Sequence, residues 1–97
     1  MHLLSPEHFA PRAHETFDLA LGESSLALTL VDIKLLAANP VPGLLRQPFA
    51  LTFRSGSAVV LPQRLYRLTN PGLGALDLFL VPVGREPQGV VYQAVFN

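Results

Sequence analysis

Apolar and polar residues alternate along most of the chain. Between residues 15 and 96, successive short runs place an apolar side chain at every second position, the period of a strand with one buried face. The runs cover residues 15–21, 26–36, 49–54, 65–69, 76–81 and 90–96, with a short edge piece at 58–61. Prolines and glycines lie mostly between the runs. The pattern predicts an all-β fold, a small barrel-like antiparallel meander of about six strands.

The longest run changes phase part-way along. Its first apolar positions are even-numbered, from Leu26 to Leu30, and its later ones are odd-numbered, from Val31 to Leu35. A β-bulge or a sharp bend produces such a one-residue shift. Bulges let a sheet curl until its edges meet, so this run favours a closed barrel over an open sheet.

A helix-start signal lies near the N-terminus. Ser5 suits the position that caps a helix, and Pro6 suits the first helical position because its fixed φ fits there. We predict a short helical cap within residues 1–12, followed by a β domain at residues 15–97. Together they form a single domain, residues 1–97.

The chain carries few charges. Charged residues make up 14% of it, against about 25% in a typical soluble domain. Hydrophobic residues make up 49%, and a small domain cannot bury all of them. The formal net charge is zero, so no net repulsion keeps molecules apart. These values predict a protein partner or a homo-oligomer. They argue against nucleic acid, because binding phosphates takes a basic surplus.

Membrane and secretory segments are not expected. The longest apolar stretch, Leu26–Ala38, contains Asp32 and Lys34 and is too short for a membrane span. The N-terminus has neither a basic region nor a long apolar region of the secretory kind. The absence of cysteine excludes disulfides and thiolate metal sites. We therefore expect a cytoplasmic protein.

The outer faces of the last two predicted strands are unusually apolar. The residues concerned are Phe79, Val81, Val83, Val91 and Val95. Strands that are buried on both faces have such near-continuous apolar sequences. We expect this candidate interface to be covered, either by the helical cap with the loop at residues 37–48 or by another chain.

Candidate chemistry is sparse. A metal site would need His2, His8 and His14 with a carboxylate such as Glu7 or Glu15, but a spacing of six does not converge such side chains. We expect no catalytic residue, cofactor or metal, and hence no enzyme.

Two arginines form a candidate polar contact. Arg64 and Arg67 flank Tyr66 on one predicted strand and could bind an anion or a partner carboxylate, or could simply form an exposed polar face. Asp77 could face Arg67 across the hairpin around the Asn70-Pro71-Gly72 turn.

Several pieces of the sequence have the form of a known family. They are Phe49-Ala50-Leu51-Thr52-Phe53-Arg54, Leu61-Pro62-Gln63, Leu65-Tyr66-Arg67-Leu68, Leu73-Gly74, Leu78-Phe79-Leu80-Val81-Pro82-Val83-Gly84 and Tyr92-Gln93-Ala94-Val95-Phe96-Asn97. With them, the chain resembles an uncharacterised bacterial family of small all-β proteins, a domain of unknown function. These residues mark a fold and not an active site. The resemblance implies no activity, but it implies an association with phage-tail-like assemblies.

These observations predict a non-catalytic structural or protein-interaction module, with a phage-tail-like or other multi-protein assembly as one setting. The alternative is a small β-barrel carrier of an apolar small molecule. Phe17, Phe53, Tyr66 and Phe96 would then line its cavity, although six strands usually leave an interior filled by side chains.

Overall fold

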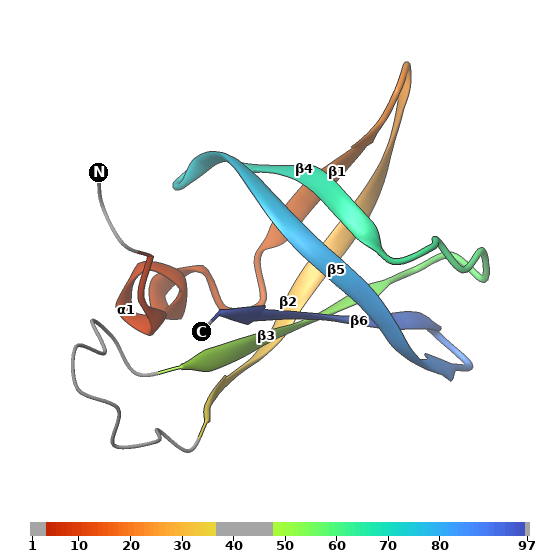
Figure 1. The fold of residues 1–97 in the computed structure, drawn as a ribbon. Helices are drawn as coiled ribbons and strands as arrows, with labels where there is room; N and C mark the ends of the chain where they lie inside the picture. Colours follow the sequence, from red (N-terminus) through yellow and green to blue (C-terminus); the bar gives the residue numbers. More distant parts are fainter. Residues whose placement is uncertain (1–3, 37–47, 97) are drawn as a thin grey trace.

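The computed structural model describes residues 4–36 and 48–96. Within these residues, six antiparallel strands close into a barrel, preceded by a short helix (Figure 1). The elements are α1 (Pro6–Phe9), the 3-10 helix η1 (Ala10–Arg12), β1 (Thr16–Leu21), β2 (Ser24–Leu35), β3 (Phe49–Ser55), β4 (Arg64–Asn70), β5 (Gly74–Glu86) and β6 (Gly89–Phe96). The predicted all-β barrel of about six strands with an N-terminal helical cap is confirmed.

The order of the strands corrects the predicted meander. Around the barrel the strands follow the order β1-β2-β3-β6-β5-β4, and β1 pairs with β4 to close it. The chain therefore makes two three-stranded meanders, β1-β2-β3 and β4-β5-β6, whereas a single meander would pair β3 with β4. β3 instead pairs with β6 over six positions, from Phe49 opposite Phe96 to Arg54 opposite Val91.

The segment between β3 and β4, residues 56–63, joins the two meanders. It is too long for a tight hairpin, and the edge strand predicted at residues 58–61 does not form there. The backbone N–H of Leu61 donates to the Tyr92 hydroxyl at 3.0 Å, and the Tyr66 hydroxyl donates to the Pro62 carbonyl at 2.6 Å. Tyrosines of two separate strands thus satisfy backbone groups that would otherwise need a sheet partner.

Bulges occur in both of the long strands. The register of β2 against β3 shifts between Leu30 and Asp32, which confirms the bulge that the change of phase predicts. A second shift, between Pro82 and Gly84, lies in β5. The apolar alternation predicts this strand only for residues 76–81, but β5 continues to Glu86. Proline lacks an N–H for the sheet, and a bulge is one of the places where a strand accepts it.

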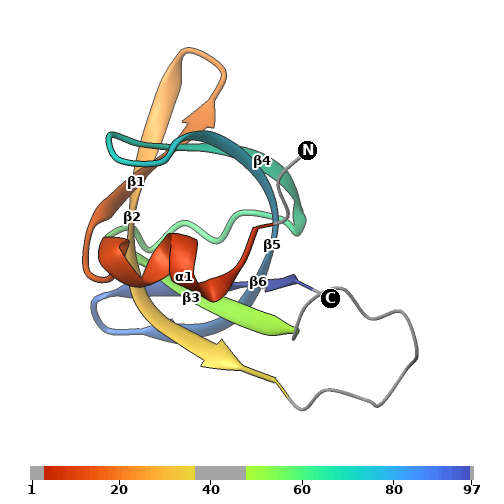
Figure 2. The same ribbon diagram turned by 90° about the vertical axis from the view of Figure 1, so that its left-hand side faces the viewer.

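The helical cap closes one end of the barrel. Figure 2 shows α1 lying across the ring of strands. Its Phe9 is fully buried, with its ring centroid 6.1 Å from that of Phe49 and 5.7 Å from that of Phe96. Phe49 and Phe96 stack on each other at 4.5 Å. Burial of these rings fixes the cap on the barrel, because a helix this short has little stability of its own.

Candidate interaction surface

The outer wall formed by β4, β5 and β6 carries exposed apolar side chains. Strand alternation buries Leu78 and Leu80 of β5 and leaves Phe79 between them 52% exposed. Val83 is 54% exposed and Val95 of β6 is 49% exposed. Three of the five predicted interface residues are therefore open to solvent, whereas Val81 and Val91 are half-buried.

The strand registers show which of these side chains lie together. Phe79 is directly opposite Leu65 of β4, and Val81 is opposite Gln93 of β6. Val95 follows Gln93 by two positions and so lies on the same face of β6. Val91 is half-buried on the same wall, between Gly84 of β5 and Arg54 of β3, and Arg54 forms an ion pair with Glu86 at 2.6 Å. We call Leu65, Phe79, Val81, Val83 and Val95 the apolar face.

Leu65 is the residue that the sequence interpretation missed. It is 61% exposed and forms the β4 side of the apolar face. Strand alternation could have predicted its exposure. Tyr66 and Leu68 lie on one face of the strand and are buried, so Leu65 must point outward from the other face. The helical cap does not cover this wall, since α1 packs at the barrel end. The loop predicted at residues 37–48 lies outside the described residues except for Pro48.

The two candidate arginines have different surroundings. Arg67 donates from Nε and Nη2 to the two carboxylate oxygens of Asp77, at 3.0 and 3.2 Å, as the hairpin register predicts. This hydrogen bond lowers the pKa of the Asp77 carboxyl below its ordinary value and raises that of Arg67. Both side chains are exposed, so water screens the pair and its contribution to stability is small.

Arg64 has no ion-pair partner among residues 4–36 and 48–96. Burial raises the pKa of the neighbouring Tyr66 hydroxyl, and the positive charge of Arg64 partly opposes that rise. Arg64 through Arg67 also line a groove of about 380 Å³, whose other wall is Ala20, Leu21 and Gly22 at the end of β1. No sequence pattern indicates this groove, because its walls come from strands that meet only when the barrel closes.

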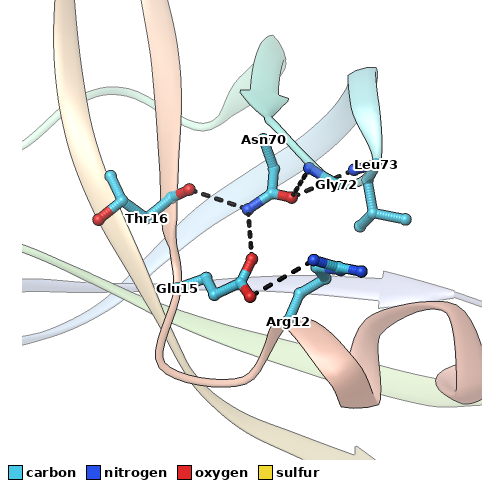
Figure 3. A network of polar contacts seen from close by, with 6 residues as sticks. All are labelled: Arg12, Glu15, Thr16, Asn70, Gly72 and Leu73. Carbon is cyan, nitrogen blue, oxygen red and sulfur yellow. Dashed lines mark hydrogen bonds and ion pairs between the residues drawn. The ribbon is translucent and has the colours of Figure 1, made fainter.

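A buried amide joins the start of β1 to the turn between β4 and β5. The Asn70 side chain is 1% exposed. Its Nδ2 donates to Glu15 Oε1 and to the Thr16 carbonyl, both at 3.1 Å. Its Oδ1 accepts the N–H groups of Gly72 and Leu73, at 2.8 and 3.2 Å (Figure 3). The amide thereby uses both of its donors and both of its acceptor positions.

Arg12 completes this network from the other side. Its Nη1 lies 3.4 Å from Glu15 Oε2, and its guanidinium covers Gly72 so closely that a Cβ there would overlap it. The hydrogen bonds of Asn70 and the ion pair of Arg12 with Glu15 hold two separate parts of the chain together. This network is part of the architecture.

The histidines do not converge in the described part of the chain. His8 Nδ1 accepts a hydrogen bond from the Ser5 N–H at 2.9 Å, as part of the helix cap. His14 lies in the loop before β1 with a φ of 68°. His2 lies outside the described residues. Residues 4–36 and 48–96 contain no group of three metal-ligating side chains and no helix long and apolar enough to cross a membrane.

Comparison with known families gives one match. The model of a domain of unknown function, DUF6916, matches residues 4–96. The chain belongs to this family. The match covers both three-stranded meanders and the helical cap, so the DUF6916 domain corresponds to the whole barrel. It confirms the predicted membership of an uncharacterised domain family. Neither the curated proteins nor the solved structures contain a match to the chain.

Proposed function

We propose that this DUF6916 protein is a non-catalytic structural or interaction module that binds another protein, or a second copy of itself, through the apolar face. The observation that carries the proposal is the exposure of Leu65, Phe79, Val83 and Val95 on three neighbouring strands. Each is about half exposed, so covering it would contribute about 1 kcal/mol. Several such residues on one wall favour a protein surface as the partner.

The packing of the barrel interior also favours an interaction module over a carrier. Phe17 and Phe53 are fully buried and meet edge to face, with ring centroids 5.3 Å apart. Phe96 stacks on Phe49, and the Tyr66 hydroxyl is bonded to Pro62. The four aromatic side chains that would line a ligand cavity thus pack against protein atoms.

The wider setting of the proposal rests on the sequence. A cytoplasmic protein with zero formal net charge suits a protein partner better than nucleic acid or a membrane surface. A phage-tail-like or other multi-protein assembly, which the resemblance implies, is one setting that we propose for this role.

Sedimentation velocity over a range of protein concentrations tests self-association. We expect concentration-dependent oligomers, which the substitution Phe79→Ser weakens. Leu35→Ser is the matched control, because Leu35 of β2 is 55% exposed but lies off the apolar face. If the wild-type protein is monomeric throughout, a photo-crosslinking amino acid at position 79 tests for another partner in the native host. The proposal fails if the protein is monomeric and position 79 gives no more crosslinked product than position 35.

A further inference from the structure

The barrel closes through a short seam. β1 and β4 pair at only two positions, Asp18 opposite Thr69 and Leu19 opposite Leu68. By contrast, β4 pairs with β5 at all seven of its residues, and β1 pairs with β2 at all six of its residues. Beyond the two closing pairs, the β1–β2 hairpin projects away from β4 (Figure 1). The β1-facing edge of residues 64–67 therefore has no strand partner in the described part of the chain.

The groove of about 380 Å³ occupies this opening. Its lining, residues 20–22 on one side and 64–67 on the other, is the stretch where the two strands have separated. An unpaired strand edge offers alternating N–H and C=O groups to an incoming chain. Extended peptides bind such edges by adding a strand to the sheet. The groove thus has the backbone chemistry to hold an extended segment.

The charge of the groove indicates what kind of segment fits. Arg67 is already paired with Asp77, whereas Arg64 is exposed and unpaired among the described residues. The carboxylates nearest in sequence on the opposite wall are Asp18 and Glu23, and neither forms an ion pair with Arg64. An acidic side chain on the added strand would give Arg64 a partner.

A second copy of the chain fits the seam poorly. Antiparallel pairing of two β4 edges would bring two unpaired Arg64 side chains to one short joint and would supply neither with a free carboxylate, because Asp77 is already paired with Arg67. Like charges on neighbouring strands destabilise the pairing. The charge therefore favours a different, acidic partner.

We propose that the seam between β1 and β4 binds an extended acidic segment of another protein, which adds a strand along residues 64–67 and places a carboxylate at Arg64. The seam and the apolar face are separate surfaces that share only Leu65 at their border. The two proposals can therefore fail independently.

A library of capped octapeptides tests the charge preference, with Thr, Val, Glu or Lys at every position. Immobilised wild-type protein should enrich peptides with Glu over those with Lys, by about 1.5- to fivefold, the range expected for one exposed charge contact. Arg64→Glu should abolish or reverse the preference. Arg85→Glu, on the exposed end of β5, is the matched control and should keep it. No enrichment, or equal enrichment on Arg64→Glu, would overturn the proposal.

The best peptide then tests the binding mode. Its addition to ¹⁵N-labelled protein should shift the amide signals of residues 64–67 and slow their hydrogen exchange. N-methylation of alternate peptide amides should block binding in one of the two registers, because only one set of N–H groups faces β4. Shifts confined to Phe79 and Val95, or equal binding by both N-methylated peptides, would contradict strand addition. Phe79→Ser should leave this binding unchanged, even where it abolishes self-association.

Discussion

The buried amide of Asn70 should be one of the most sensitive positions for stability. Asn70→Ala removes four hydrogen bonds and leaves the Gly72 N–H without its partner, whereas the Leu73 N–H keeps its bond to the Asn70 carbonyl at 3.2 Å. Each such bond contributes about 1 kcal/mol net, and an unsatisfied buried group costs about 1–3 kcal/mol. Allowing for water entering the site, we expect a loss of about 2–4 kcal/mol.

That loss is large for a domain of this size. The free energy of unfolding of such a domain is about 5–15 kcal/mol, so the variant gives up a substantial part of it. In a thermal melt followed by circular dichroism, the midpoint should fall by about 10–25 °C. Urea titration should show a lower midpoint with an unchanged slope. Gln63→Ala, at an exposed position before β4, should change little.

A second substitution, Asn70→Asp, removes the hydrogen-bond donor of the amide and keeps its acceptor. Asn70→Asp keeps an oxygen for the Gly72 and Leu73 N–H groups, but it places a carboxylate beside Glu15. We expect destabilisation at neutral pH that lessens once acid protonates the pair. The reasoning is wrong if Asn70→Ala costs less than about 1 kcal/mol, or if the loss in Asn70→Asp is the same at neutral and acidic pH.

Three further predictions follow from the local geometry. Gly72→Ala should displace the guanidinium of Arg12 and lower the free energy of unfolding by less than about 1 kcal/mol, because a flexible side chain can move. In an Arg12→Ala background the loss should vanish, which urea titrations of the four proteins of a double-mutant cycle can measure. Gly89→Ala should cost about 2 kcal/mol or more by the same measurement, because its φ is 152° and a Cβ there would overlap a backbone carbonyl of β3, which cannot swing away. NMR titration should find the pKa of Asp77 below 3.8 in the wild type and closer to 3.8 in Arg67→Gln. The stability that the ion pair adds is therefore fully present above pH 3.8 and is lost as the pH falls through the lowered pKa.

Most of the features of the fold that could be predicted follow from the alternation of apolar and polar residues along the strands. It placed Leu78 and Leu80 inside and Phe79 outside, and the change of phase after Leu30 located a bulge. Leu65 was missed although the same rule places it outside. These features depend on neighbouring residues, which a sequence pattern records directly.

The features that could not be predicted depend on distant residues. Asn70 looks like an ordinary turn residue, and nothing local shows that Glu15 and Thr16 complete its hydrogen bonding. The extension of β5 beyond Pro82 to Glu86 was also missed, because the bulge that accommodates this proline exists only against β6. The pairing of β3 with β6, and hence the groove at the opposite seam, is set by how the whole barrel closes.

The sheet order also bears on how the chain folds. Each three-stranded meander, β1-β2-β3 and β4-β5-β6, pairs strands that follow one another along the chain. The β3–β6 pairing joins residues about forty positions apart, so its loop-closure entropy is paid after the more local pairings have formed. The two-pair seam between β1 and β4 gains least from closing. We expect two half-barrels to form early, dock along β3 and β6, and close the β1–β4 seam last, which makes that seam the first place to open in the native protein.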